Sequence, residues 1–250
     1  MLVNQTIGKL EALGLAAMAS GLTEQLEAPG TYDALSFSDR LGLLVDRESD
    51  ARDSRRLATR LKAAKLRHQA VIEDVDFRSP RGLDRSVVLS LAEGRFVASH
   101  HNVVITGATG CGKSYLACAL AHSVIGHGYT ALYARTPRLL DDLSLGRVDG
   151  RYGRLLSSLQ RVSLLVLDDF LLTPAGIEVC RDLLEVIEDR SQLRSTIVVS
   201  QLPVDKWLEA MADPTLGEAI VDRILQSSHR IAMKGPSMRK RQPNDEETPS

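Results

Sequence analysis

Aromatic residues are scarce in this sequence. Phe, Trp and Tyr together make up 4% of its 250 residues. Proteins that hold single-stranded nucleic acid without sequence preference stack successive bases on aromatic side chains. A base-stacking platform of that kind is therefore not expected here.

Cysteine is also rare, and its positions suggest neither a disulfide framework nor a metal site. Cys111, Cys118 and Cys180 are odd in number and have no metal-ligand spacing. Such usage is typical of a reducing compartment, because oxidising compartments favour paired cysteines. We therefore expect a cytoplasmic protein.

The sequence has almost no net charge and no long apolar run. Its 31 basic and 32 acidic residues leave a formal charge of −1, so any attraction to nucleic acid must come from a local patch. No apolar run approaches membrane-spanning length, and the opening "MLVNQTIGKL" has no basic stretch followed by an apolar block. We expect no signal peptide, no transmembrane helix and no membrane partner.

The residues that are present have the proportions of a folded globular protein, with 44% hydrophobic and 25% charged. Residues 3–68 have a helical pattern: "LEALGLAAMASGLTEQLE" is followed by a turn at "APGTYD" and by a long helix that starts near Ser38 and Asp39. After "KGPSM" the apolar periodicity stops. We predict an all-helical domain at 1–68, a larger domain at 69–235 and a flexible tail at 236–250.

Five short apolar runs in the larger domain read as buried strands. They are "NVVIT", "TALYA", "SLLVLDD", "STIVVS" and "HRIAM", and a helical stretch separates each from the next. This alternation is typical of βαβ units, whose strands are buried on both faces and run parallel. The predicted fold class is α/β with a parallel sheet, preceded by the small all-helical N-terminal domain.

The segment "GATGCGKS" follows the first of these strands and matches the phosphate-binding loop pattern G-x-x-x-x-G-K-[ST]. Its glycines allow backbone N–H groups to surround a phosphate chain, and the helix that follows favours negative charge at its start. Lys113 is expected to reach the β- and γ-phosphates of ATP, and the Ser114 hydroxyl suits Mg²⁺. The expected nucleotide-binding residues are Gly107, Ala108, Thr109, Gly110, Cys111, Gly112, Lys113, Ser114 and Tyr115. An ordinary glycine-rich turn is the alternative, but the motif and its flanking strand and helix agree independently.

Two carboxylates at the end of a later strand could supply the hydrolytic chemistry. Asp168 and Asp169 end the run "SLLVLDD", and strand ends of this kind lie beside the phosphate loop in open parallel sheets. We predict that Asp168 holds the Mg²⁺ hydration shell and that Asp169 orients the attacking water. Gln201 ends a further strand, where its amide could touch the γ-phosphate. A polar turn at the end of a strand is the plain alternative for each of these residues.

Several of these segments resemble those of a known family. The segments "NVVITGATGCGKSYLACALA", "LLVLDDF", "STIVVSQLPVDKW" and "AIVDRILQSSHRIAMKGPSMRK" are similar to insertion-sequence transposition helper ATPases of the IstB type, close relatives of the DnaC helicase loaders in the AAA+ superfamily. The N-terminal "LEALGLAAMA" also matches the helical front domain of that family. The resemblance implies a five-stranded AAA+ core that binds ATP, a homo-oligomeric ring or filament, duplex DNA and a partner transposase.

The resemblance also implies roles for individual residues. Arg223 in "VDRIL" corresponds to the arginine finger, which reaches the γ-phosphate of a neighbouring subunit, and Arg239 corresponds to a second sensor arginine. Without the resemblance, a surface salt bridge would be the preferred interpretation of Arg223. Two departures stand out: many relatives have glycine where this chain has Leu171, and most AAA+ enzymes have glutamate where it has Asp169.

A basic stretch in the helical domain could contact DNA. On one continuous helix at 100° per residue, five arginines fall within one arc, while Leu57, Leu61 and Ala64 gather on the opposite side. Arginines spaced in this way suit phosphate contacts with little sequence readout, although a solvated helix face is the plain alternative. These candidate DNA contacts are Arg52, Arg55, Arg56, Arg60 and Arg67.

Three functions fit these observations. The first is a Mg²⁺-dependent ATPase that oligomerises on duplex DNA and cooperates with a transposase in target selection. The second is a DnaC-like loader of a replicative helicase. The third is a small-molecule kinase, against which stands the lack of an arginine-rich lid and the presence of paired aspartates at a strand end. The helical front domain favours the first over the second.

Overall fold

A computed structural model describes residues 2–238, which divide into two units. The first unit ends at Thr59 and the second begins at Arg60, so the division falls inside a long helix, α4 (Phe37–Ala64). Residues 60–68, expected in the helical domain, belong to the second unit.

The first unit consists of α1 (Leu2–Ala12), α2 (Ala16–Glu27), α3 (Pro29–Tyr32) and the first part of α4. The segment expected to form one helix is divided between α1 and α2, because Gly14 takes a left-handed conformation with φ of 73°. Helix α4 also begins before the predicted start. Ser36 and Asp39 form a reciprocal cap, in which the Ser36 hydroxyl accepts from Asp39 N at 3.2 Å and Asp39 accepts from Ser36 N at 3.3 Å.

A buried carboxylate ties α2 to α4. Glu48 accepts hydrogen bonds from the backbone N–H groups of Ala17 and Met18, at 3.0 and 3.2 Å, in the first turn of α2. It also accepts from Arg52 Nε at 2.9 Å and from Arg55 Nη2 at 3.2 Å. These donors, Arg52 first, lower the pKa of Glu48. The glutamate therefore stabilises free N–H groups at a helix start and fixes two arginines of the predicted basic face.

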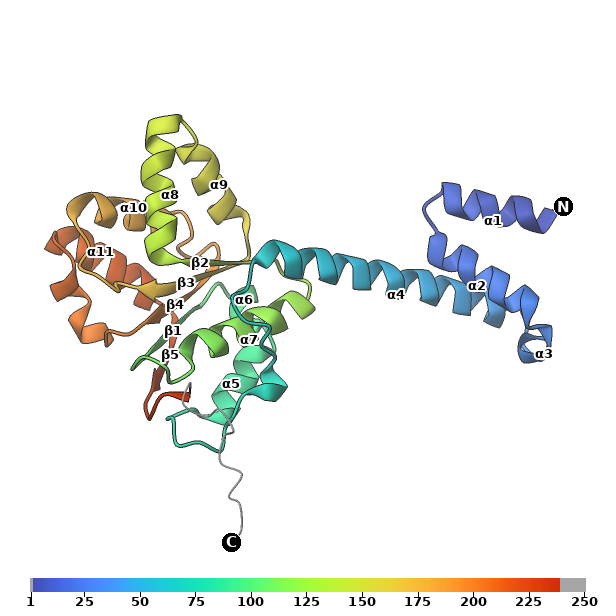
Figure 1. The fold of residues 1–250 in the computed structure, drawn as a ribbon, viewed down its shortest axis with the longest axis horizontal. Coiled ribbons are helices and arrows are strands. Elements are labelled where there is room, and N and C mark those ends of the chain that lie inside the picture. The colour runs from blue at the N-terminus through green and yellow to red at the C-terminus, as the bar shows by residue number, and fades with distance from the viewer. Residues whose placement is uncertain (1, 239–250) are drawn as a thin grey trace, which may run out of the picture. The chain divides into compact units, whose positions relative to one another are not determined.

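The second unit is built on a parallel sheet of five strands (Figure 1). The strands are β1 (Asn102–Gly107), β2 (Ala131–Arg135), β3 (Leu164–Phe170), β4 (Ser195–Ser200) and β5 (Ser228–Met233). They lie in the order β2-β3-β4-β1-β5, and all neighbours pair in parallel. The predicted strands and the predicted α/β fold class are confirmed.

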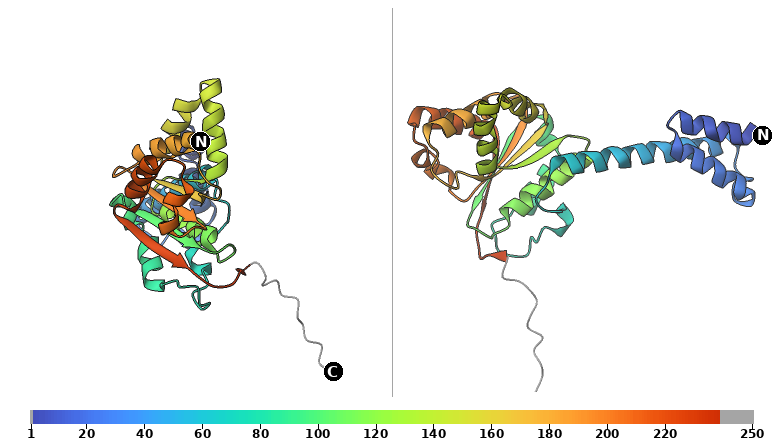
Figure 2. Two further views of the ribbon diagram at one scale, coloured as in Figure 1. Left: turned by 90° about the vertical axis from the view of Figure 1, so that its left-hand side faces the viewer. Right: turned by 45° about the horizontal axis from the view of Figure 1, so that its top comes forward.

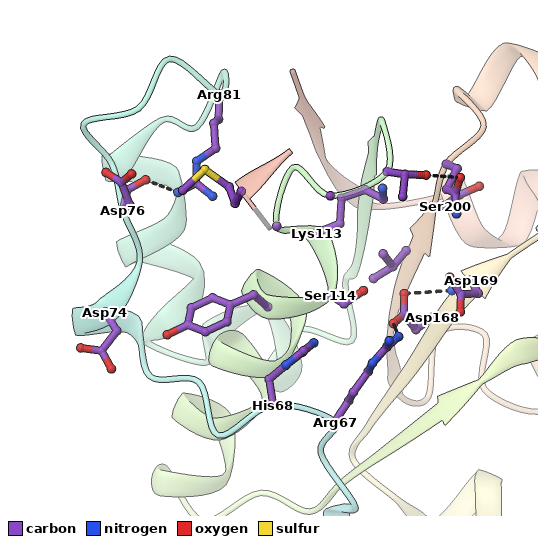
Figure 3. A pocket seen from close by; sticks show the side chains of 17 residues that line it. Arg67, His68, Asp74, Asp76, Arg81, Lys113, Ser114, Asp168, Asp169 and Ser200 are labelled. Carbon is purple, nitrogen blue, oxygen red and sulfur yellow. Dashed lines mark hydrogen bonds and ion pairs between the residues drawn. The ribbon is translucent and has the colours of Figure 1, made fainter. Parts of the chain in front are cut away.

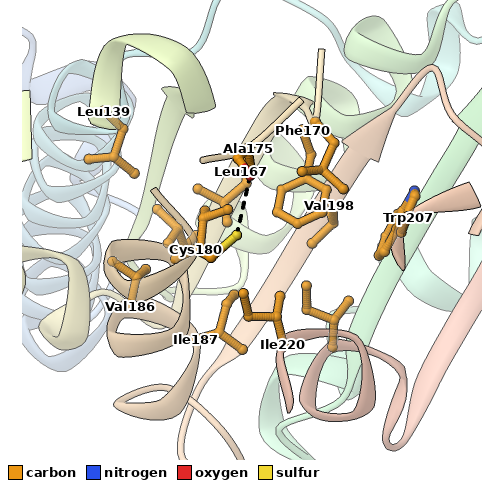
Figure 4. Packing of buried hydrophobic residues seen from close by; sticks show 14 of the residues in the cluster. Leu139, Leu167, Phe170, Ala175, Cys180, Val186, Ile187, Val198, Trp207 and Ile220 are labelled. Atoms are coloured by element: carbon orange, nitrogen blue, oxygen red, sulfur yellow. Dashed lines mark hydrogen bonds between the residues drawn. The ribbon is translucent and has the colours of Figure 1, made fainter. Parts of the chain in front are cut away.

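Helices cover both faces of this sheet (Figure 2). Helix α7 (Lys113–Gly126) packs against β1, β2, β3 and β4 on one face. The other face is covered by α8 (Thr136–Asp149), α9 (Tyr152–Arg161), α10 (Ile177–Glu188) and α11 (Pro214–Leu225). In the core beneath them, Phe170 packs against Trp207 with ring centroids 5.0 Å apart, and both side chains are fully buried (Figure 4).

Shorter elements complete the second unit. They are the 3-10 turns at Ile72–Asp74, Val204–Lys206 and Leu208–Ala210, and the helices α5 (Arg85–Ala92) and α6 (Arg95–Ala98). Asp84 caps the start of helix α5, and its carboxylate accepts from Ser86 N at 2.8 Å. Among residues 2–238, no helix is both long enough and apolar enough to cross a membrane.

The order of the strands determines where the candidate site lies. Because β4 lies between β1 and β3, the loop after β1, the carboxyl end of β3 and the carboxyl end of β4 meet at one edge of the sheet. In open parallel sheets this edge is where ligands bind.

Candidate nucleotide site

The phosphate loop connects β1 to α7 and has the conformation that its glycines predict. Gly107 and Gly110 have φ of 149° and 86°. A Cβ at Gly107 would lie 2.2 Å from the carbonyl oxygen of Met233, and one at Gly110 would lie 2.2 Å from the Ser237 hydroxyl. The loop therefore needs glycine at both positions for its backbone conformation and for the close approach of the chain beside it.

Lys113 is held by its own loop. Its Nζ donates to the carbonyl oxygens of Gly107 and Ala108, at 2.7 and 2.9 Å, and the side chain is 7% exposed. The ammonium group therefore lies inside the ring of backbone that the motif forms. A phosphate chain in the loop would offer this ammonium stronger, charged acceptors in place of two carbonyl groups.

Asp168 is buried at the end of β3, with 1% of its surface exposed. The hydroxyl of Tyr133 on the neighbouring strand β2 donates to its Oδ2, and Arg67 Nη1 lies 3.8 Å from the same oxygen. Burial and the bond to Asp168 raise the pKa of Tyr133, so the phenol stays protonated and remains a donor. The carboxylate is thus fixed in one orientation.

Asp169 has an unusual backbone and a charged partner. Its φ is 57°, in the left-handed region that non-glycine residues rarely adopt, and its N–H donates to Asp168 Oδ1 at 2.9 Å. Arg135, the last residue of β2, donates from Nε to Asp169 Oδ2 at 2.9 Å, and its Nη2 lies 2.8 Å from that oxygen. The predicted water-orienting carboxylate is therefore engaged with an arginine that the sequence did not suggest.

Gln201 lies where the sequence predicted, just after β4 and beside the phosphate loop. Its amide oxygen accepts from the Thr109 hydroxyl at 2.6 Å. Because this bond joins the end of β4 to the loop after β1, the amide is held at the rim of the pocket.

These residues surround one cavity of about 340 Å³, close to the lower end of the usual range for ligand pockets. Ser114 and Asp168 lie close together on one side of it, and Asp74, Asp76 and Arg81 lie on the other (Figure 3). The cavity brings together the loop, both aspartates and Gln201 as predicted. The lining residues that the sequence did not predict for this pocket are Arg67, His68, Asp74, Asp76, Arg81, Val199, Ser200 and Met238.

Most of these missed residues come from the connection between α4 and α5. Arg81 is 6% exposed and donates from Nη1 to Cys111 O at 3.3 Å, so it supports the backbone of the loop. Asp76 caps the turn before it, and hydrogen bonds from the Ser79 hydroxyl and from backbone N–H groups lower the pKa of Asp76 to about 2. The only signal in the sequence was the cluster of charges in "EDVDFRSPR", which carries no periodicity.

The chain just beyond β5 also lies against the loop. Lys234 N donates to Arg81 O at 2.8 Å, and Met238 N donates to Gly110 O at 2.9 Å. Residues 236–238, expected in a flexible tail, therefore pack on the phosphate loop. Arg239 lies outside the described residues.

The site fits a nucleoside triphosphate with Mg²⁺. The positive-φ glycines, the ammonium of Lys113 and the start of α7 together suit a chain of phosphates. The hydroxyl of Ser114 and the carboxylate of Asp168 are hard oxygen donors, the kind that Mg²⁺ prefers. Within residues 2–238, no group of three or more His, Cys, Asp or Glu side chains could hold a metal by itself.

Arg223 lies at the opposite edge of the sheet from this pocket. Its carbonyl oxygen accepts from the side chain of Asn102 at the start of β1, at 3.3 Å, and its guanidinium pairs with Glu188 on α10. The phosphate loop begins at the other end of β1, roughly 16 Å away at about 3.3 Å per residue. Arg223 therefore contributes nothing to the nucleotide pocket of its own chain.

The predicted face of five arginines does not form as one helical surface. Helix α4 ends at Ala64, where Lys65 turns into the left-handed region with φ of 52°, and Arg67 beyond it lines the nucleotide pocket. Arg52 and Arg55 are fixed by Glu48, as described above. Arg56 is exposed on α4 and lies 3.3 Å from Asp53, and Arg60 is half-buried in the second unit. The continuous periodicity on which the prediction depended stops before Arg67.

Comparison with protein families gives a clear match. The family model for the IstB-like ATP binding protein matches residues 8–246. A putative insertion sequence ATP-binding protein of Sinorhizobium fredii is 48% identical over 242 residues, which is 97% of this chain and 98% of that protein. The chain belongs to the IstB-like ATP binding protein family. The resemblance seen in the sequence is confirmed.

Solved structures share the fold of this IstB-like protein at lower identity. The crystal structure of DnaI is similar with a TM-score of 0.58 and 22% identity, covering 66% of this chain and 91% of that one. The crystal structure of the DnaC helicase loader is similar with a TM-score of 0.56 and 21% identity, covering 68% of this chain and all of that one. The core of the IstB-like protein therefore has the AAA+ fold.

Proposed function

We propose that this IstB-like protein is an ATP-dependent transposition helper that oligomerises on duplex DNA, hydrolyses ATP as a switch and cooperates with a transposase in target selection. The observation that carries the proposal is the set of groups around one pocket: a complete phosphate loop, two strand-end carboxylates and a strand-end amide, in a chain of the IstB-like family. The name of the relative from Sinorhizobium fredii supports the link to insertion sequences.

Each residue has a role that follows from its position. The loop from Gly107 to Tyr115 would bind the triphosphate, with Lys113 on the β- and γ-phosphates. Ser114 and Asp168 would hold Mg²⁺, which neutralises charge that develops on the phosphates during transfer. Asp169 would orient the attacking water, and Gln201 would contact the γ-phosphate. The side chain of Asp169 is one methylene shorter than that of glutamate. This suits slow hydrolysis of ATP, as in a switch, better than the rapid turnover of a motor protein.

Arg223 would complete the site of a neighbouring subunit. It lies on the far edge of the sheet and therefore cannot serve its own pocket, so the proposed finger requires a second copy. An arginine supplied in this way stabilises charge on the transferred phosphoryl group. Arg239 would add a further positive charge at the γ-phosphate.

A helicase loader is the second candidate. It is favoured by the fold shared with DnaI and the DnaC helicase loader. Both likenesses lie below 25% identity and bear on the fold alone, whereas the relative with 48% identity is named for an insertion sequence.

A complementation experiment tests the shared site. Lys113→Ala subunits retain Arg223, and Arg223→Ala subunits retain a complete loop, so each variant has the half that the other lacks. Each variant alone should be nearly inactive as an ATPase, while a mixture should recover a substantial share of wild-type turnover. In the matched control, Lys113→Ala subunits are mixed with subunits that carry both Lys113→Ala and Arg223→Ala. This mixture should stay inactive.

A mixture that stays inactive would contradict the shared site. If the mixture stayed inactive while the wild-type protein hydrolysed ATP as a monomer with no response to DNA, the oligomeric switch would be excluded. A self-contained phosphotransferase would then explain the same phosphate loop.

A further inference from the structure

Arg223 is held on its own subunit by a carboxylate of the adjacent helix. Helices α10 and α11 pack side by side (Figure 1). Glu188, the last residue of α10, forms an ion pair with Arg223 in the last turn of α11. Arg223 Nη1 also donates to Ala219 O of its own helix at 3.1 Å. The guanidinium group therefore lies along its own helix, beside the end of α10.

Glu188 supplies the negative charge around this arginine. Among residues 2–238, it is the only ion-pair partner of Arg223. Arg223 also borders a polar cavity of about 250 Å³, whose other described lining residues carry hydroxyl, amide and imidazole groups and no carboxylate. Loss of the carboxylate at position 188 would therefore leave the guanidinium without an anion on its own subunit.

The position of Glu188 at a helix end is unfavourable for its charge. The last carbonyl groups of a helix carry partial negative charge, so an anion there is disfavoured and a cation is favoured. Arg223 in the last turn of α11 follows this rule, whereas Glu188 at the end of α10 does not. The carboxylate thus does not stabilise its own helix, and its favourable contact is the one with Arg223.

The ion pair is open to exchange with another anion. The side chains of Arg223 and Glu188 are 31% and 53% exposed. Partly exposed pairs of this kind shift an equilibrium by only about two- to fivefold. A γ-phosphate carries more negative charge than one carboxylate and accepts the same forked pair of hydrogen bonds from a guanidinium. It can therefore replace Glu188 as the partner of Arg223.

We propose that Glu188 is a positioning residue that competes with the γ-phosphate of a neighbouring subunit for Arg223. The arginine leaves its own subunit when the neighbour holds ATP and returns to Glu188 when the neighbour holds ADP. This inference rests on the shared site proposed above, and it adds how that site distinguishes the two nucleotides.

The exchange makes the association of two subunits depend on the nucleotide. With ATP, association breaks the pair between Arg223 and Glu188, and the new bonds to the γ-phosphate must outweigh that loss. With ADP there is no γ-phosphate to bind, so the pair persists on both sides of the equilibrium. Loss of the carboxylate should therefore favour association with ATP and leave association with ADP unchanged.

The first test measures ATP turnover against protein concentration in the presence of a short duplex. Glu188→Gln should lower the protein concentration for half-maximal turnover by about two- to fivefold, the factor for one partly exposed pair. Maximal turnover per subunit should stay at the wild-type value, because Glu188 does not contact the γ-phosphate. Sedimentation of the variant with ADP should match the wild type.

Two further variants serve as controls for this measurement. Glu188→Asp keeps the charge on a shorter side chain, so its half-maximal concentration should fall between those of Glu188→Gln and the wild type. Glu178→Gln makes the same chemical change at the start of α10, where the glutamate is exposed and pairs with Arg181. It should leave both turnover and association unchanged.

The second test places the substitution in one kind of subunit at a time. In the mixture described above, Lys113→Ala subunits supply Arg223 and Arg223→Ala subunits supply the loop. Adding Glu188→Gln to the Lys113→Ala subunits should lower the half-maximal concentration of the mixture. The same change in the Arg223→Ala subunits should have no effect, because no arginine is held there. A general effect on folding would not depend on which subunit carries the change.

The outcomes separate this inference from the function beneath it. An inactive mixture of Lys113→Ala and Arg223→Ala subunits overturns the shared site, and this inference with it. An active mixture that does not respond to Glu188→Gln in the subunits that supply Arg223 overturns the exchange alone. Equal shifts with ATP and ADP, or a fall in maximal turnover, would give Glu188 a role in the assembled interface, and either result also overturns the exchange.

Discussion

Leu171 has a backbone conformation that favours glycine. Its φ is 52°, and its side chain is 6% exposed in the core beneath α10. A left-handed conformation costs a non-glycine residue ~1–2 kcal/mol, whereas deleting a buried leucine side chain costs ~2–5 kcal/mol. The packing of this side chain therefore outweighs the strain, which explains how leucine is tolerated here.

The balance between side-chain packing and backbone strain at Leu171 predicts how two substitutions change stability. Leu171→Gly should lower the free energy of unfolding by ~1–3 kcal/mol, because the lost packing exceeds the relieved strain. Leu171→Ala should be at least as destabilising, since it loses the packing and keeps the strain. Chemical denaturation of both variants checks the order, and an alanine variant clearly more stable than the glycine variant would contradict it.

Residue identity alone predicted the members of the site but not their partners. Lys113, Ser114, Asp168, Asp169 and Gln201 were found from a motif and from strand ends, and all line one cavity. Tyr133 was seen only as part of the apolar run "TALYA", and Arg135, which follows that run, was not singled out, because a pattern of burial says nothing about which strand lies alongside. Their roles depend on the pairing of β2 with β3.

At the scale of elements, Arg190 joins three pieces of the second unit. It follows α10, is 1% exposed, and donates to Leu159 O at the end of α9, to Val162 O, and to Ser195 O and the Thr196 hydroxyl at the start of β4. Burial lowers the pKa of Arg190 to about 9, so the group stays charged at neutral pH. Its acceptors are neutral, and their number offsets the cost of burying the charge.

Removing this arginine should be costly. Arg190→Met leaves several buried acceptors without donors and should lower the free energy of unfolding by about 3 kcal/mol or more. Arg190→Lys keeps a charge but cannot reach all four acceptors, so it should fall between methionine and wild type. Urea denaturation provides the measurement, with Arg194→Met, an exposed neighbour, as the control expected to change stability by less than about 0.5 kcal/mol. Equal stability of Arg190→Met and wild type would contradict this role.

Helix boundaries were less predictable than strands. The helical pattern continues smoothly past Ala64, yet α4 ends there, and the first segment breaks at Gly14. A hydrophobic repeat indicates which face is buried, but it does not say where tertiary contacts turn the chain. The position of Arg67 at Asp168 was missed for this reason.

At the scale of the whole molecule, the division of the chain bears on DNA binding. Of the five candidate arginines, Arg52 and Arg55 are held by Glu48, and Arg67 lines the nucleotide pocket. Arg56 and Arg60 remain as the best candidates on α4. If the proposed assembly on duplex DNA forms, we expect these two arginines to contact its phosphates.

The salt dependence of DNA binding tests these two contacts. In the double variant Arg56→Gln, Arg60→Gln, the slope of the logarithm of DNA affinity against the logarithm of salt concentration should become shallower by about 2. Each phosphate contact contributes about 1 to this slope. Affinity for ATP should stay the same. Fluorescence anisotropy of a labelled duplex at several salt concentrations measures the slope, and Arg181→Gln, Lys206→Gln protein serves as the charge-matched control. An unchanged slope would remove α4 from the DNA interface.

The sequence by itself determined the α/β class, the strands, the phosphate loop and the strand-end carboxylates. These features depend on short-range rules: strands buried on both faces need continuous apolar runs, and a loop that surrounds phosphates needs glycines at fixed spacing.

Only the tertiary structure determined which residues lie next to one another in the site. The order β2-β3-β4-β1-β5 brings Arg135 and Tyr133 to the aspartates, the end of α4 brings Arg67, and the chain after β5 reaches the phosphate loop. Local patterns show that an element has a face to bury, but they do not name the element that covers it. That choice is made by the packing of residues far apart in the chain, so the arginine that pairs with Asp169 could be recognised only in the folded molecule.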